Sequence, residues 1–316
     1  MRLQYRGTNK YKRKGPIPLG HNSSHCQLSV QVPWRLWRSA YSNHIFGYFA
    51  MATITRSAKS SSNWTENELI AYNITISSLS PDKFFPTPDP PLNDIDPAIL
   101  NSSLAADTTT LSIAASTYLA HLRYAAGATQ EGFIDIFVIE TLKLLGFENS
   151  RAIVAMHYTI PFTICGEADR VAHLDECLIH DTTFVFLVLV KDNTFTGSPA
   201  EAQVVAGAIA TFQFNNMKRE EYGLDPLNAM TIPCIIMSGT RPTFYLVPVT
   251  AELSEAVTCG WYPKHPTQVL RCETVAADQD AAAGMENIEY RKLALKRLLA
   301  FKELAENHLV QILEGI

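Results

Sequence analysis

The chain has 316 residues, 47% of them hydrophobic and 18% charged, a composition that indicates a globular protein with a sizeable core and excludes a disordered or fibrous one. The formal net charge of -5 is unevenly spread: residues 1–65 hold ten Lys and Arg and no acidic residue, whereas the remainder holds 16 basic and 31 acidic residues. An acidic body disfavours nucleic acid as a partner, because phosphate contacts require Lys and Arg.

Residues 1–62 predict a basic leader without fixed structure, because they are rich in Ser, Lys and Arg and show no periodic apolar face. Two interpretations stay open: a mitochondrial targeting segment, or upstream residues that are not translated because Met51 is the natural start. The N-terminus has no apolar signal region, and no apolar run approaches the ~20 residues of a membrane span. We therefore expect an intracellular protein of the cytoplasm or nucleus, without membrane contact.

The six cysteines form no Cys-x-x-Cys pair and no Cys/His set with zinc spacing. We expect them to be reduced, mostly buried thiols, as is usual inside cells. They are Cys26, Cys165, Cys177, Cys234, Cys259 and Cys272.

Residues 63–126 should form an N-terminal helical segment. Thr65 and Glu68 have the spacing of a capping box and predict a helix that runs to about Ile74. Residues 80–97 contain six prolines and predict an extended connector. A second helix is expected over residues 112–125.

Residues 127–270 should form the core. Ile134, Val138 and Leu142 recur at helical spacing within a helix over residues 131–145. Residues 184–190 are all apolar, so a strand over 183–191 should lie in the centre of a sheet covered on both faces. Other strands are expected at residues 151–157, 161–166, 174–180, 232–238 and 243–248, and other helices at 200–215 and 251–258. A linker over 271–284 and a C-terminal segment over 285–316, with a long helix at 287–313, complete the chain.

Several short motifs together resemble one group of proteins. The group consists of uncharacterised proteins from mushroom-forming fungi, which are themselves similar to the PD-(D/E)XK nuclease superfamily. The resemblance implies an α/β fold with a restriction-endonuclease-like core, a mixed central sheet flanked by helices, and helical additions at both ends. The motifs are Ile164-Cys-Gly-Glu167, Asp175-Glu-Cys-Leu178, Leu187-Val-Leu-Val-Lys-Asp-Asn193, Glu201-Ala-Gln203, Phe212-Gln-Phe-Asn-Asn216, Ile232-Pro233 and Phe244-Tyr-Leu-Val-Pro-Val-Thr250.

The resemblance also implies where the nuclease chemistry would lie. Active members hold Mg²⁺ with an Asp on one strand and with the Glu of a Glu-x-Lys pair on the next, where the Lys orients the attacking water. These positions correspond to Asp175, Lys191 and Asn193, so an ammonium stands where a metal ligand belongs and a neutral amide replaces the Lys. Gln203 fits the Gln of the following helix, and Glu140 could project from the preceding one.

We therefore expect a remnant site of Asp175, Lys191, Asn193 and Gln203, in which Asp175 and Lys191 form an ion pair. No catalytic residue and no cofactor is expected. The main hypothesis is a non-catalytic, nuclease-like accessory or interaction protein of a fungus, with an unknown protein partner.

Two other functions stay open. One is an active Mg²⁺-dependent nuclease with a rearranged metal site made by Asp175, Asp192 and Glu201. The other is an accessory protein of a fungal pathway such as secondary metabolism.

Four further polar residues near the strand ends receive structural interpretations. Lone histidines beside strands are more often structural than metal ligands, and acidic residues near a turn are by default exposed loop carboxylates. They are His157, His173, Asp169 and Glu176.

Overall fold

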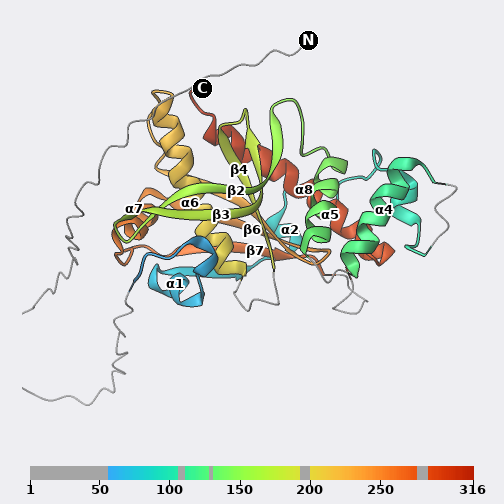
Figure 1. Cartoon of the computed structure of the whole chain (residues 1–316), viewed down its shortest axis with the longest axis horizontal. Coiled ribbons are helices and arrows are strands. Elements are labelled where there is room, and N and C mark those ends of the chain that lie inside the picture. Colours follow the sequence, from blue (N-terminus) through green and yellow to red (C-terminus); the bar gives the residue numbers. More distant parts are fainter. Residues whose placement is uncertain (1–55, 106–110, 128–130, 193–199, 276–283) are drawn as a thin grey trace, which may run out of the picture. The chain divides into compact units, whose positions relative to one another are not determined.

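A computed structural model describes residues 56–105, 111–127, 131–192, 200–275 and 284–316 (Figure 1). The helical elements are η1 (Ser61–Asn63), α1 (Glu66–Ala71), α2 (Pro81–Phe84), α3 (Pro97–Asn101), α4 (Ile113–Ala126), α5 (Glu131–Leu144), α6 (Ala200–Glu221), α7 (Ala251–Cys259) and α8 (Ile288–Ile312). The strands are β1 (Ile74–Ser78), β2 (Ala152–Ile164), β3 (Glu167–His180), β4 (Phe184–Lys191), β5 (Ala229–Ser238), β6 (Arg241–Thr250) and β7 (Thr267–Glu273).

The strands form one mixed sheet in the order β1-β7-β6-β5-β4-β3-β2. Strands β1 and β7, and likewise β4 and β5, run parallel, whereas every other neighbouring pair is antiparallel. Helices flank this sheet, so the expected α/β class with a mixed, helix-flanked sheet is confirmed (Figure 1).

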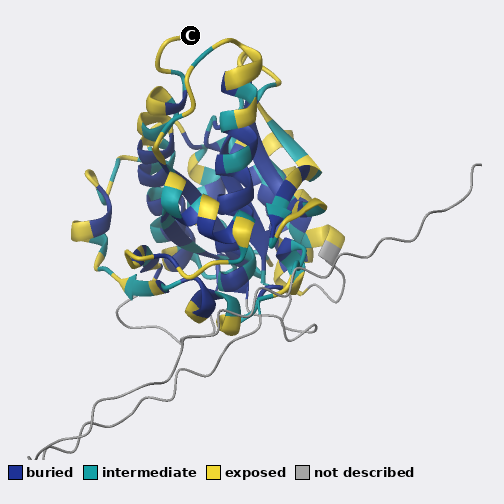
Figure 2. Ribbon diagram, turned by 90° about the vertical axis from the view of Figure 1, so that its left-hand side faces the viewer, coloured by how far each residue is buried: buried dark blue, intermediate teal, exposed yellow. Residues whose placement is uncertain are grey.

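Strand β4 is an interior strand of the sheet, between β5 and β3, as its unbroken apolar run predicted. All eight of its residues are buried, and because alternate residues point to opposite faces, both faces of the strand are covered. Helices α6 and α8 pack against it, and Figure 2 shows the buried residues concentrated in the sheet and on the helix surfaces that face it. Gly207 lets α6 approach closely, since a Cβ there would lie 3.2 Å from Leu174 Cδ2.

The first two core strands differ from expectation. Residues 151–157 and 161–166 were predicted as separate strands, but β2 is a single strand along one edge of the sheet. Its irregularity is local: His157 has a φ of 48° within the strand. Pro161 is tolerated because an edge strand has one side without ladder hydrogen bonds. Strand β3 likewise begins at Glu167, earlier than the strand expected over residues 174–180.

Two short strands at the opposite side of the sheet were not predicted. The helix expected to reach Ile74 stops at Ala71, and Asn73, with a φ of 54°, turns the chain into β1. Strand β1 pairs with β7 from Ile74↔Thr267 onward. Neither strand is long enough to show a clear alternation of apolar residues, so their pairing depends on long-range contacts.

Part of the expected leader belongs to the folded body. The Arg56 guanidinium donates to the Ala71 carbonyl from Nε at 3.0 Å and Nη2 at 2.7 Å. Ser61 is fully buried, and the Lys59 ammonium lies 2.5 Å from Glu68 Oε1. The body therefore begins no later than residue 56, whereas the prediction for residues 1–55 lies outside the described residues. In the described part of the chain, no helix combines the length and the apolar character needed to cross a membrane.

Candidate functional site

The polar end of β4 brings together residues from two neighbouring strands, as the sequence predicted. Lys191 is the last residue of β4, and its backbone N–H donates to Asp175 Oδ2 on β3 over 2.9 Å. The contact therefore involves the lysine backbone. The ammonium group points to a different partner.

The ion-pair partner of Lys191 is Asp135 of helix α5, which corrects the expected pair with Asp175. Lys191 Nζ donates to Asp135 Oδ1, and the two residues are only 8% and 6% exposed. Asp135 shares a helix face with the buried Val138 and Leu142, three and seven residues further on. A carboxylate on an otherwise apolar helix face was the sequence signal for this residue. Glu140, the expected contributor from α5, is part-exposed and pairs with Lys143.

The position of Glu176 also differs from the expectation. It was expected to be an exposed loop carboxylate, but it lies within β3, is fully buried, and has no hydrogen-bond partner on either carboxyl oxygen among the described residues. It pairs across the ladder with Leu189, and therefore lies on the same sheet face as Lys191, two residues further along β4.

The environment favours the neutral form of Glu176. Burial raises the pKa of this carboxyl to about 8; the charge of Lys191 opposes that rise, whereas the charges of Asp135 and Asp175 add to it. Near neutral pH the Glu176 carboxyl therefore holds its proton.

Lys191 keeps its charge in the same surroundings. Burial by itself lowers the pKa of the ammonium, but the hydrogen bond to Asp135, the charges of Asp175 and Asp135 and, at a pH where it is ionised, the charge of Glu176 outweigh burial and raise this pKa above its usual value. We call Asp135, Asp175, Glu176 and Lys191 the lysine cluster. Its centre is a buried, permanently charged ammonium with a carboxylate hydrogen-bonded to it.

The rearranged metal site draws on residues with separate partners. Asp192 accepts a hydrogen bond from Ser238 Oγ at 2.7 Å. Glu201 accepts from the Tyr245 hydroxyl at 2.8 Å and pairs with Arg271 Nη1 at 2.9 Å. Over all the residues placed in the structure, no three His, Cys, Asp or Glu side chains are grouped so that they could hold a metal ion.

The remaining predicted residues lie outside the lysine cluster. Gln203 is half-buried on α6, and Asn193 lies outside the described residues. His173 is exposed, and its Nδ1 is 3.2 Å from Thr159 Oγ1, a surface contact between β2 and β3. His157 and Asp169 are exposed on the same two strands.

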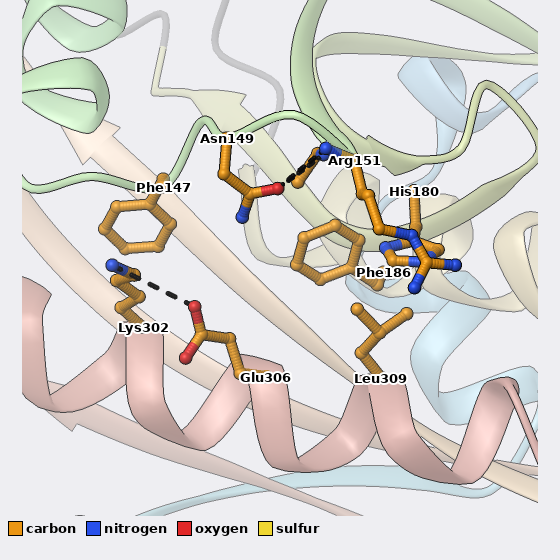
Figure 3. Close-up of a pocket in the computed structure, with 9 residues that line it drawn as sticks. Phe147, Asn149, Arg151, His180, Phe186, Lys302, Glu306 and Leu309 are labelled. Atoms are coloured by element: carbon orange, nitrogen blue, oxygen red, sulfur yellow. Dashed lines mark hydrogen bonds and ion pairs between the residues drawn. The ribbon is translucent and has the colours of Figure 1, made fainter.

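A separate pocket of about 200 Å³ lies between the loop that precedes β2 and helix α8 (Figure 3). Phe147, Phe186 and Leu309 provide its apolar surface, and Lys302 and Glu306 face it from α8. It contains none of the residues that the sequence singled out.

Comparison with known proteins does not identify the chain: no protein-family model matches it, and no curated protein matches it significantly. The geometry of the lysine cluster and the resemblance described above are therefore the basis for a functional proposal.

Proposed function

We propose that this protein is a non-catalytic relative of the PD-(D/E)XK nucleases that serves as an accessory or interaction protein of a fungus. In this proposal the Lys191 ammonium permanently occupies the place that a divalent cation has in active members. The observation that carries it is the buried ion pair between Lys191 and Asp135, with Asp175 and Glu176 beside it.

The location of this pair supports the proposal. Helix α5, strand β3 and the end of strand β4 each contribute an acidic or basic group, and helix α6 follows β4. The resemblance predicts the same order: an acidic residue on one strand, the decisive pair at the end of the next, and then a helix. The finer assignment of the sheet to the restriction-endonuclease-like fold is part of the same proposal.

The charges in the cluster oppose binding of a cation. A hard cation such as Mg²⁺ prefers oxygen ligands and would have to replace or tolerate an ammonium beside it. Glu176 holds a proton near neutral pH, because its pKa is about 8, and so offers no carboxylate at that pH. The remaining carboxylates already have donors, since Asp135 accepts from Lys191 Nζ and Asp175 from Lys191 N.

The active-nuclease alternative, with Asp175, Asp192 and Glu201, requires these three groups to exchange their present partners for one ion. Glu201 would have to release both Arg271 and Tyr245. We therefore favour the non-catalytic proposal over this one.

Titration of the full-length protein with Mg²⁺ or Mn²⁺ in an isothermal calorimeter tests the proposal, together with plasmid cleavage in the same buffers. We expect neither cleavage nor binding tighter than about 1 mM, which corresponds to roughly -4 kcal/mol. Tighter binding that disappears in Asp175→Ala would refute the proposal. Retention of that binding in Asp175→Ala but loss in Glu140→Ala would instead indicate a surface site on α5, because Glu140 is part-exposed.

A further inference from the structure

The turn between β2 and β3 has an unusual backbone for the residue it contains. Cys165 and Gly166 have φ angles of 52° and 79°, so both central residues of this two-residue hairpin are left-handed. Such turns normally place Asn or Gly at the first position, because a side chain there is unfavourable. The Ile164-Cys-Gly-Glu167 motif, which the lysine cluster does not involve, therefore places a cysteine where the backbone does not favour one.

The tip of this hairpin is bound to the C-terminal end of helix α7 (Figure 1). The N–H of Cys165 donates to the Val257 carbonyl over 2.9 Å, and the N–H of Gly166 donates to the Thr258 carbonyl over 2.6 Å. Both carbonyls belong to the last turn of α7, whose orphan acceptors need donors from outside the helix.

The second of these hydrogen bonds places two cysteines near each other. Cys165 directly precedes the donor Gly166, and Cys259 directly follows the acceptor Thr258. With standard bond lengths, the 2.6 Å hydrogen bond between Gly166 N and Thr258 O holds the two cysteine Cα atoms within about 8 Å of each other. This limit applies only if the connecting atoms lie in a straight line, and a bent arrangement is shorter and approaches the range of about 4.4–6.8 Å that disulfides span.

The Cys165 thiol is also directed at this end of α7. A Cβ on Gly260, the residue after Cys259, would lie only 3.2 Å from Cys165 Sγ. On its other side the sulfur is 3.4 Å from the Tyr72 hydroxyl. Burial raises the pKa of Tyr72 above its usual value, so its hydroxyl stays protonated and is able to donate a hydrogen bond to the sulfur.

The other cysteines in the described residues have no such neighbour and no access to solvent. Cys177, Cys234 and Cys272 are buried, whereas Cys259 is exposed and Cys165 is partly exposed. Burial also raises the pKa of Cys177 to about 12 and that of Cys272 to about 11, which keeps these thiols protonated and unreactive.

We propose that Cys165 and Cys259 are a redox-modification site, at which a low-molecular-weight disulfide such as oxidised glutathione forms a reversible cross-link between the β2–β3 turn and helix α7. The exposed Cys259 thiolate attacks one sulfur of oxidised glutathione and releases one glutathione thiolate. The Cys165 thiolate then attacks Cys259 Sγ in the mixed disulfide and releases the second. Two protein thiols are thereby oxidised to one disulfide, one oxidised glutathione is reduced to two glutathione molecules, and the two thiol protons pass to these products.

The test uses the full-length Cys26→Ser protein, which lacks the remaining cysteine outside the described residues. The protein is equilibrated in glutathione buffers of increasing oxidised fraction, trapped in acid, and mapped by peptide mass spectrometry without reduction. We expect a cross-linked peptide pair containing Cys165 and Cys259. Because the bond closes a loop of nearly one hundred residues, we also expect the melting temperature to rise by about 5 °C or more.

Two variants distinguish this site from general thiol reactivity. Cys259→Ser removes an exposed side chain, should fold normally, and should leave Cys165 reduced. Cys165→Ser should accumulate Cys259 as a mixed disulfide with glutathione. If the parent protein instead carries glutathione on Cys259 with Cys165 still reduced, if both thiols stay reduced, or if the cross-link forms only in denaturant, the inference is wrong.

Discussion

Replacing Lys191 with Met should strongly destabilise the protein. Met keeps the apolar length of the side chain but removes the ammonium, so the ionised Asp135, which is 6% exposed, loses its ion-pair partner. Breaking a buried pair from one side costs about 3–5 kcal/mol, because a charge is left uncompensated in the interior. For a body of this size that loss corresponds to a fall in melting temperature of about 10 °C.

Urea unfolding at 25 °C measures this loss, and two controls separate the pair from general packing. Lys143→Met removes a part-exposed lysine of α5 that pairs with Glu140 at 3.3 Å, and should cost less than about 1 kcal/mol. The double variant Lys191→Met with Asp135→Leu replaces both partners by apolar groups and should recover about 2 kcal/mol or more of the loss.

Two outcomes would contradict this prediction. If Lys191→Met costs less than about 1 kcal/mol, or if the double variant shows no coupling, then the ammonium is not the charge that compensates Asp135. Either result would refute the proposal that a lysine replaces a metal ion in this protein.

Glu176→Gln should gain stability relative to the natural protein as the pH rises. The folded-state pKa of Glu176, about 8, lies above its value of 4.5 in the unfolded chain, so the folded state binds more protons between these two pH values. The natural protein therefore loses stability as the pH rises from 4.5 to about 8, by up to about 1.4 kcal/mol per pH unit. Equal pH profiles for the two proteins in urea unfolding would contradict this prediction. The double change Lys191→Glu with Asn193→Lys rebuilds the Glu-x-Lys pattern and should raise the melting temperature in the presence of Mg²⁺, whereas a melting temperature indifferent to Mg²⁺ would argue against a nuclease ancestry of the cluster. Deleting residues 1–50 should change the melting temperature by less than about 2 °C. Deleting residues 1–62 should lower it by about 5 °C or more, because this deletion also removes Arg56, Lys59 and the buried Ser61. Equal melting temperatures for the two deletion variants would show that the contacts of residues 56–62 contribute nothing to stability. Gly260→Ala should lower the free energy of unfolding, measured in urea, by about 1–2 kcal/mol, because the φ of 72° at this residue is left-handed and a Cβ would meet Cys165 Sγ at 3.2 Å.

Local sequence determined the elements whose signal is contained within one segment. The apolar run of β4 requires cover on both faces, and the structure places it between β3 and β5. The apolar periodicity of α5 and the Thr65–Glu68 capping box, in which Thr65 N donates to Glu68 Oε2 at 2.7 Å, likewise act over a few residues. Such signals can be read without knowing what the rest of the chain does.

Tertiary structure alone decided the partners of the charged groups. The sequence placed Asp175 and Lys191 at the same end of the sheet, yet the ammonium binds Asp135, 56 residues earlier in the chain, on α5. Whether Glu176 is exposed or buried depends on how the helices and the neighbouring strands cover β3, which no local pattern specifies. The pairing of strands β1 and β7 is likewise decided by tertiary structure, since their register joins residues that lie almost two hundred positions apart. Backbone periodicity is a short-range property, whereas burial and charge pairing arise only when distant segments exclude water together.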